Sequence, residues 1–467
     1  MKQAPDKSSN TSAFEAALDY LERATPRGSP KHKRLYAFGH GIERTAHLLD
    51  LLDGGKCRDK SIIVAGTKGK GSTTAMISSI LTAAGYRTGM FTGPHLHSCC
   101  ERFQIDGHTI PEDRLATYVL QSRRAIESEW RKPSLGTPTK FEIETAIALK
   151  YFDDEGVDFT VLEVGIGGRH DAVNVASPLI SVITSISLEH TDMLGNSLAE
   201  IAYAKAGIIR PAGTVVSAPQ PGEAERVVER VCNDLGAHLI KVGVDWKFTS
   251  LSRGPYEVDT GQYFQTFKQA SSQSTGLSLG LTGHPLFIPL LGPHQLENAT
   301  VAIATVDELR TASVSVAQVE EGLKSVKWPG RLEILSKRPL IVVDGAHNPY
   351  SMQTLTAALP SVFRFDRLIL VVGISSDKDI PEMLRAICPL SDELVITQFD
   401  HPRSACAQAV ANLVPPGAPS PRVTTNTQDA ISLAIRLAQQ GDLICITGSL
   451  YLVGEARELL LRGPRCS

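Results

Sequence analysis

Short apolar runs alternate along this chain with stretches in which apolar residues recur at helical spacing. The apolar runs predict strands at 62–65, 86–92, 159–164, 179–188, 215–217 and 239–242. The helical spacing predicts helices at 13–23, 73–84, 112–132, 139–152, 198–209 and 222–235. Nearly continuous apolar strands separated by helices are typical of a parallel sheet covered on both faces. This part of the chain therefore predicts a parallel-sheet α/β domain.

The pattern changes twice further along the chain. Residues 245–290 alternate polar and apolar positions and predict exposed antiparallel hairpins. The helix-breaking string Trp328-Pro329-Gly330-Arg331 predicts a domain boundary. Beyond it we expect a smaller, Rossmann-like α/β domain with strands at 340–343, 367–372, 393–396 and 443–446, and helices at 350–359, 379–387, 404–412, 427–439 and 450–461. The predicted organisation is a flexible start over 1–12, a first domain over 13–327 and a second over 328–467.

Composition narrows the function classes. The 467 residues suggest two or three domains. A net charge of −3 gives no bulk attraction to nucleic acid or to an anionic membrane, so we expect neither as a partner. The polar start and the lack of a long apolar run predict a cytoplasmic protein without a membrane span. Eight scattered cysteines without Cys-x-x-Cys spacing argue against a disulfide framework and a zinc site.

The strand at 62–65 leads into the glycine-rich string Gly66-Thr67-Lys68-Gly69-Lys70-Gly71-Ser72-Thr73. Glycines let backbone N–H groups turn inward around an anion, and we expect Ser72 and Thr73 to cap the following helix. Lys70 would then reach the outer phosphates of a nucleotide. Val64 stands where the common phosphate loop has its first glycine, so a plain strand–turn–helix remains the alternative.

Three further residues carry candidate chemistry. Glu163 lies in an apolar strand, where a carboxylate is costly unless it is paired or bound to a metal. The glycines that follow lack the dinucleotide-binding spacing. His190 follows another apolar run, and by itself it is more often a structural histidine than a ligand. The pattern alone predicts that Lys205 is an exposed charge on a helix.

The loop string Gly-Thr-Lys-Gly-Lys-Gly-Ser resembles that of the folylpolyglutamate synthase and dihydrofolate synthase family, relatives of the Mur peptide ligases. Further strings resemble that family in its order, from about residue 39 to 454. They begin at Gly39, Thr92, Thr139, Leu162, Glu189, Lys205, Gly292, Pro329, Asp344 and Gly448. The resemblance implies a P-loop ATPase domain followed by a glutamate-binding α/β domain.

The resemblance also implies site residues. It places ATP on Gly66, Thr67, Lys68, Gly69, Lys70, Gly71, Ser72, Thr73, Asn298, Arg331 and Asp344. It implies two Mg²⁺ ions held by Ser72, Glu163, His190 and a carbamylated Lys205, and it allows K⁺ as a further cation. Lys70, Glu163, His190 and Lys205 are the implied catalytic residues. The implied substrate-binding residues are Gly41, Ile42, Thr139, Phe141, His170 and Asp171 for the pterin substrate, and His347, Ser449 and Tyr451 for glutamate.

Two positions depart from the family pattern. His40 replaces a leucine in the segment before the phosphate loop. Gly93 replaces a serine that supplies a magnesium ligand in relatives. A non-catalytic nucleotide-binding relative is therefore one alternative, and a Mur-type amino acid ligase is another. The favoured interpretation is a monomeric ligase that uses ATP to join L-glutamate to tetrahydrofolate or dihydropteroate through an acyl phosphate.

Overall fold

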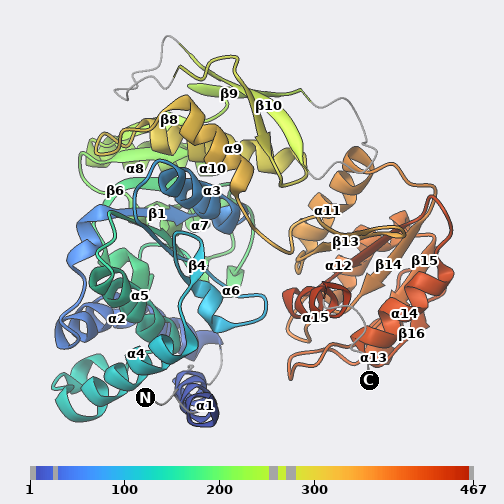
Figure 1. Cartoon of the computed structure of the whole chain (residues 1–467), viewed down its shortest axis with the longest axis horizontal. Helices are drawn as coiled ribbons and strands as arrows, with labels where there is room; N and C mark the ends of the chain where they lie inside the picture. The colour runs from blue at the N-terminus through green and yellow to red at the C-terminus, as the bar shows by residue number, and fades with distance from the viewer. Residues whose placement is uncertain (1–6, 25–29, 252–260, 270–279, 462–467) are drawn as a thin grey trace, which may run out of the picture.

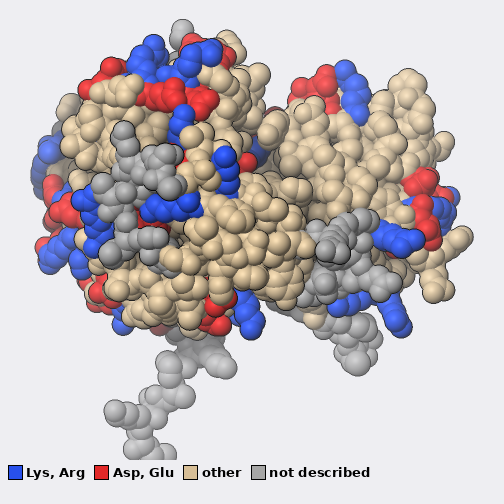
Figure 2. All heavy atoms as spheres, turned by 90° about the horizontal axis from the view of Figure 1, so that it is seen from above, with Lys and Arg blue, Asp and Glu red and all other residues tan. Residues whose placement is uncertain are grey.

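The computed structural model describes residues 7–24, 30–251, 261–269 and 280–461. The elements form two lobes (Figure 1). The chain passes from one lobe to the other between Ser325 and Glu333, a stretch that contains the predicted boundary at 328–331. Figure 2 shows a notch between the lobes and, on the face it draws, Lys and Arg interspersed with Asp and Glu.

An eight-stranded sheet forms the centre of the first lobe, with the order β4-β3-β2-β5-β1-β6-β7-β8. The strands from β2 to β8 in this order are parallel, whereas β3 and β4 are antiparallel additions at one edge. The strands are β1 (Ser61–Ala65), β2 (Thr88–Phe91), β3 (Phe103–Ile105), β4 (His108–Thr109), β5 (Phe159–Glu163), β6 (Pro178–Ile183), β7 (Thr214–Ser217) and β8 (His238–Lys241).

Helices cover both faces of this sheet, so its central strand β1 is buried on both sides. Ile62 and Val64 pack in a core with α3 (Lys70–Ala83), α9 (Pro293–Asp307) and α10 (Val316–Ser325). Ile63 and Ala65 point the other way. The helices on that face are α1 (Lys7–Arg23), α2 (Pro30–Leu51), α4 (Glu112–Arg124), α5 (Lys140–Asp154), α7 (Leu198–Lys205) and α8 (Gly222–Leu235).

The hairpin prediction is confirmed where the chain is described. Strands β9 (Trp246–Ser250), β10 (Gln262–Lys268) and β11 (Pro285–Ile288) form an antiparallel sheet in the order β11-β10-β9. Residues 252–260 and 270–279 lie outside the described residues. The inner face of this sheet contributes Phe264 and Ile288 to the core that also contains α9.

The second lobe has a six-stranded sheet in the order β12-β13-β17-β14-β15-β16, parallel except for β12. Its strands are β12 (Glu333–Lys337), β13 (Leu340–Asp344), β14 (Leu368–Val372), β15 (Glu393–Ile396), β16 (Arg422–Val423) and β17 (Leu443–Thr447). Its helices are α11 (Pro349–Val362), α12 (Ile380–Ile387), α13 (Ala407–Ala411), α14 (Thr427–Leu437) and α15 (Leu450–Leu461). The predicted fold class is confirmed, although the edge strands β3 and β4 of the first lobe and β12 and β16 of the second were not predicted.

Several boundaries differ from the predictions. Helix α1 begins at Lys7, inside the stretch expected to be flexible. Strand β6 ends at Ile183. The chain then turns, and its main-chain carbonyls accept hydrogen bonds from the phosphate loop. Helix α7 ends at Lys205 and continues as a 3₁₀ turn. Helix α4 ends at Arg124 and is followed by a π-type turn to Glu129.

Across the described part of the chain, no helix has both the length and the apolar character needed to cross a bilayer.

Candidate active site

The glycine-rich string forms the turn between β1 and α3, as predicted. Gly66 has φ 150°, and a Cβ there would lie 1.8 Å from Thr184 Oγ1. Gly69 has φ 83° and is the N-cap residue of α3. Both positions therefore require glycine. The prediction that Ser72 and Thr73 cap the helix is wrong: both lie in its first turn, where they are buried.

The segment after β6 holds this loop in place. The backbone N–H groups of Thr67 and Lys68 donate to the carbonyl of Ser185 at 2.8 and 3.1 Å. Thr67 Oγ1 donates to the carbonyl of Ser187 at 3.1 Å. Lys70 Nζ donates only a long bond, 3.3 Å, to the carbonyl of Thr67. The loop backbone is thus fixed while the Lys70 ammonium has a single weak protein acceptor among the described residues.

Lys205 is buried beneath the loop, and the prediction from pattern alone that it is an exposed charge is wrong. Its side chain leaves the last residue of α7, and its Nζ donates to the carbonyl of Gly66 at 2.6 Å. Lys205 is only 3% exposed. Burial, followed by the nearby Lys70 cation, lowers the pKa of Lys205 to about 7.

Glu163 is the last residue of β5 and faces the start of α3. Its Oε2 accepts from the backbone N–H of Gly93 at 3.1 Å, and it would lie 3.4 Å from a Cβ at Gly71. Burial raises the pKa of Glu163, and the Lys70 cation opposes that effect. The carboxylate is therefore buried at the carboxyl edge of the sheet, where open α/β sheets bind ligands.

His190 is the N-cap residue of the short helix α6 (Thr191–Leu194), with a left-handed φ of 52°. Burial lowers the pKa of His190, and the neighbouring charges of Glu189, Lys70 and Lys205 also act on it. The predicted catalytic residues Lys70, Glu163, His190 and Lys205 therefore gather around one loop.

The predicted nucleotide residues beyond the loop lie close to it. Asn298, on α9, has its Oδ1 2.2 Å from the place where a Cβ of Gly69 would stand. Asp344 ends β13, and its carboxylate accepts from the backbone N–H groups of Leu332 and Ala346, each at 2.9 Å. Burial raises the pKa of Asp344, an effect that the Arg331 cation opposes.

His347 lies in the same loop as Asp344. Burial, together with the Lys68 cation, lowers its pKa to about 4, so the ring is neutral near pH 7. Its Nδ1 is 2.7 Å from the carbonyl of Gly345. Lys68 belongs to the first lobe and His347 to the second, so the two lobes meet at this point.

Ser449 and Tyr451 follow β17 beside that loop. The backbone N–H of Gly448 donates to the carbonyl of Ala346 at 3.1 Å, and Ser449 Oγ accepts from the N–H of Tyr451. The ring of Tyr451 stacks on His401 with centroids 3.8 Å apart. The three predicted glutamate residues therefore share one edge of the second sheet.

The predicted pterin residues form a second group, around the segment that follows β5. A Cβ at Gly41 would lie 3.2 Å from the carbonyl of His170. A Cβ at Gly165 would lie 2.9 Å from the ring of Phe141 and 3.3 Å from Asp171 Oδ2. Ile42 is half-buried nearby on α2.

Thr139 caps α5 and forms the predicted capping box with Glu142. The partner of Glu142 is Arg44, a pairing that no sequence pattern predicted. Its Nε and Nη2 each donate to the Glu142 carboxylate at 2.7 Å, and both side chains are buried. The two lie 98 residues apart, so only the fold brings them together.

Two other functional candidates were not predicted, namely Glu189 and Asn348. The only signal in the sequence is that each adjoins a predicted site residue, His190 and His347 respectively.

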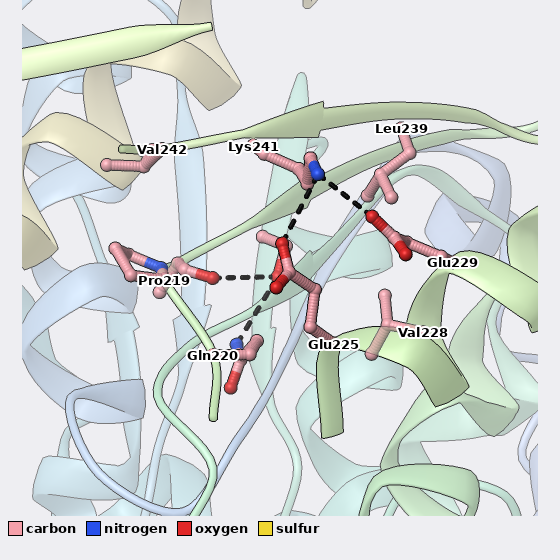
Figure 3. Close-up of a pocket in the computed structure, with 10 residues that line it drawn as sticks. Pro219, Gln220, Glu225, Val228, Glu229, Leu239, Lys241 and Val242 are labelled. Carbon is pink, nitrogen blue, oxygen red and sulfur yellow. Dashed lines mark hydrogen bonds and ion pairs between the residues drawn. The ribbon is translucent and has the colours of Figure 1, made fainter. Parts of the chain in front are cut away.

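A small cavity of about 20 Å³ lies between β8 and α8 (Figure 3). Lys241 there pairs with Glu225 at 3.2 Å and with Glu229 at 2.8 Å. None of its lining residues belongs to the predicted site.

Models of two protein domain families match this chain. Residues 64–306 match the Mur ligase middle domain, and residues 330–450 match the Mur ligase, glutamate ligase domain. The chain is 35% identical over 454 residues to the dihydrofolate synthase/folylpolyglutamate synthase of Mycobacterium tuberculosis, covering 91% of each chain. It is also 35% identical over 431 residues to a probable bifunctional folylpolyglutamate synthase/dihydropteroate synthase of Halobacterium salinarum, covering 91% of this chain but only 50% of that relative's length.

A solved structure of Mycobacterium tuberculosis folylpolyglutamate synthase complexed with ADP superposes with a TM-score of 0.83. It is 31% identical in sequence, and the match covers 98% of this chain and 100% of the other. The chain therefore belongs to the folylpolyglutamate synthase/dihydrofolate synthase family of the Mur ligases.

Proposed function

We propose that this protein is an ATP-dependent ligase that adds L-glutamate to folates, extending the glutamate chain of tetrahydrofolate and converting dihydropteroate to dihydrofolate. The observation that supports this most directly is the meeting of the phosphate loop with the loop of Asp344 and His347 where the two lobes touch. A ligase must bring ATP, an acid and an amine to one point, and such a junction does so. The relatives' names and the ADP in the solved relative agree with this function.

The proposed reaction has two steps. A carboxylate is a poor acyl donor, so the γ-phosphoryl group of ATP is first transferred to the folate carboxylate to give an acyl phosphate. The glutamate amine then attacks the carbonyl carbon, and phosphate leaves. Both steps depend on positioning and on neutralising phosphate charge rather than on a protein nucleophile.

We propose different residues of the chain for binding the different parts of the substrates. We assign the phosphates to Lys70 and to the N–H groups of the loop at the start of α3, where the helix dipole favours an anion. We assign the rest of the nucleotide to Asn298, Arg331 and Asp344. The edge of the second lobe that carries His347 would hold the incoming glutamate.

Magnesium fits the donors that this site offers. Bound Mg²⁺ would neutralise charge on the transferred phosphoryl group, and Glu163, His190 and Ser72 are the proposed protein ligands. Within the described residues, no three His, Cys, Asp or Glu side chains cluster as a metal site. We propose that a carbamate on Lys205 provides a further anionic ligand. K⁺ stays a prediction from the resemblance alone.

The buried position of Lys205 agrees with that modification. Carbon dioxide adds to a neutral amine, and an amine with a pKa of about 7 is partly neutral near pH 7. A carbamate also replaces an ammonium ion that would lie beside Lys70 and repel a bound cation.

The assay that tests the function measures phosphate release from ATP with dihydropteroate or tetrahydrofolate, each with and without L-glutamate. We expect glutamate-dependent release with at least one of them. Release with UDP-muramyl peptides alone would show a Mur-type ligase instead. Tight ATP binding without release on any pterin substrate would show a non-catalytic relative.

The Gly93→Ser variant tests the metal site. A Cβ at residue 93 would lie 3.2 Å from Arg102 Nη1, so a serine fits after a small shift of that side chain. We expect turnover within about threefold of the unchanged enzyme, and half-maximal activity at a several-fold lower Mg²⁺ concentration, because a hydroxyl is added beside Glu163. A magnesium titration of phosphate release measures both values.

Gly93→Ala is the matched control, because it adds the same Cβ without the hydroxyl. It should leave the magnesium dependence unchanged. An equal gain in both variants, or loss of activity in the serine variant only, would contradict the placement of residue 93 at the metal site.

A further inference from the structure

Glu189 connects the two lobes at the candidate active site. Its Oε1 accepts from Lys68 Nζ at 2.7 Å and from Asn348 Nδ2 at 2.6 Å. Lys68 belongs to the phosphate loop, whereas Asn348 belongs to the second lobe. The Lys68 and Glu189 side chains are 24% and 16% exposed, so solvent screens their contact only in part. In Figure 1, α6, which follows Glu189, and α11 lie on the sides where the lobes face each other.

The amide of Asn348 is fixed at both ends. Its Oδ1 caps α11 by accepting from the backbone N–H of Ser351 at 2.9 Å, and its Nδ2 donates to Glu189. Ser351 Oγ in turn accepts from the N–H groups of His347 and Asn348, each at 3.1 Å. The position of Asn348 therefore sets the position of His347, next to it in the chain.

The two lysines of the phosphate loop have different surroundings. Lys68 donates to the Glu189 carboxylate, whereas Lys70 has only a 3.3 Å contact with a backbone carbonyl. A charge-assisted bond of 2.7 Å holds an ammonium much more firmly than a long bond to a carbonyl. Lys70 is thus the lysine available to the phosphates, and Lys68 is directed at the other lobe.

We propose that Glu189 is a positioning residue that joins Lys68 of the phosphate loop to Asn348 of the second lobe and thereby sets the distance between the nucleotide and the incoming glutamate. This proposal rests on the proposed function and deepens it. Glu189 acts through its two partners and touches neither reacting group.

The test uses the full-length enzyme with Glu189→Gln, Asn348→Ser and the double variant. Glutamine keeps the shape of Glu189 without its charge. Serine is a good N-cap, so it preserves the start of α11 but is too short to reach Glu189. Glu229→Gln is the matched control, because Glu229 forms a comparable 2.8 Å bond with a lysine away from the site (Figure 3). Thermal unfolding shows that each variant is folded.

Each single variant should raise the KM for glutamate about tenfold and change the KM for ATP less than about threefold. The double variant should have the same KM for glutamate as the more impaired of the two single variants, because both changes remove the same link between the lobes. The control should change neither constant. Multiplicative effects in the double variant would overturn the proposal. The proposal would also be overturned if Asn348→Ser left both KM values unchanged while Glu189→Gln altered the magnesium dependence. Glu189 would then act on the metal.

Small-angle X-ray scattering gives a second measurement that does not depend on activity. Glu189→Gln and Asn348→Ser should increase the radius of gyration, and Glu229→Gln should not. If the unchanged enzyme shows no glutamate-dependent phosphate release, the proposed function fails while the scattering result still decides the link. Unchanged scattering in both link variants would overturn it.

Discussion

Replacing Lys205 by alanine is expected to lower glutamate-dependent phosphate release by about 10³-fold. The Lys205 side chain lies beneath the phosphate loop, bonded to the carbonyl of Gly66, and the proposed carbamate supplies one of the anionic ligands of the metal. Alanine removes the ligand and leaves the donors of Glu163 and His190 incomplete. Initial rates at saturating ATP, folate and glutamate measure the effect.

Two observations separate a carbamate from a purely structural lysine. Small carboxylates such as formate or acetate should restore part of the activity of Lys205→Ala, because they can occupy the vacated ligand position. The unchanged enzyme, equilibrated with ¹³C-bicarbonate, should show a carbamate carbon signal that Lys205→Ala lacks and Lys241→Ala retains. Full activity of Lys205→Ala would contradict the proposed metal site.

Replacing Arg44 by methionine is expected to lower the free energy of unfolding by about 3–5 kcal/mol. Arg44 and Glu142 form a two-pronged ion pair whose side chains are only 2% and 5% exposed. Methionine fills similar space but leaves the Glu142 carboxylate buried without its cation. Urea unfolding monitored by circular dichroism measures the change.

Arg123→Met is the matched control. Arg123 also donates to a glutamate, Glu127, at 2.8 Å, but both side chains are about half exposed. Its loss should cost at most about 0.5 kcal/mol, because water replaces the contact. Adding Glu142→Leu to Arg44→Met should recover part of the lost stability, since no charge is then left buried. Equal effects of the two arginine variants would show that burial does not determine the strength of this pair.

The sequence was sufficient for most of the fold because its signals are local. The apolar run of β1, the glycine-rich turn and the helix after it are neighbours in the chain, and each gives a distinct pattern. Strands β12 and β16 escaped prediction because β12 carries partly exposed residues and β16 has only two. Strand β6 was predicted too long, since nothing in its apolar run shows where the sheet ends.

The clearest sequence signals for candidate site residues lay at the ends of strands. Glu163 and Asp344 end β5 and β13, and the parallel sheets bring such ends together. The burial of Lys205 gave no signal in the pattern, because apolar residues are spread around α7 and do not mark which face is buried. The contacts Arg44–Glu142 and Glu189–Asn348 span 98 and 159 residues, so only tertiary structure reveals them.

Trp328 is an intrinsic fluorophore beside the phosphate loop. Its ring packs on the first turn of α3, with Cζ2 2.4 Å from the place where a Cβ of Gly71 would stand, and it precedes Arg331 by three residues. The chain's other tryptophans, Trp130 and Trp246, lie beside His47 and in the core under the three-stranded sheet. A nucleotide held by the phosphate loop would bring its charge close to Trp328, so the fluorescence of Trp328 would follow the filling of the loop without any added label.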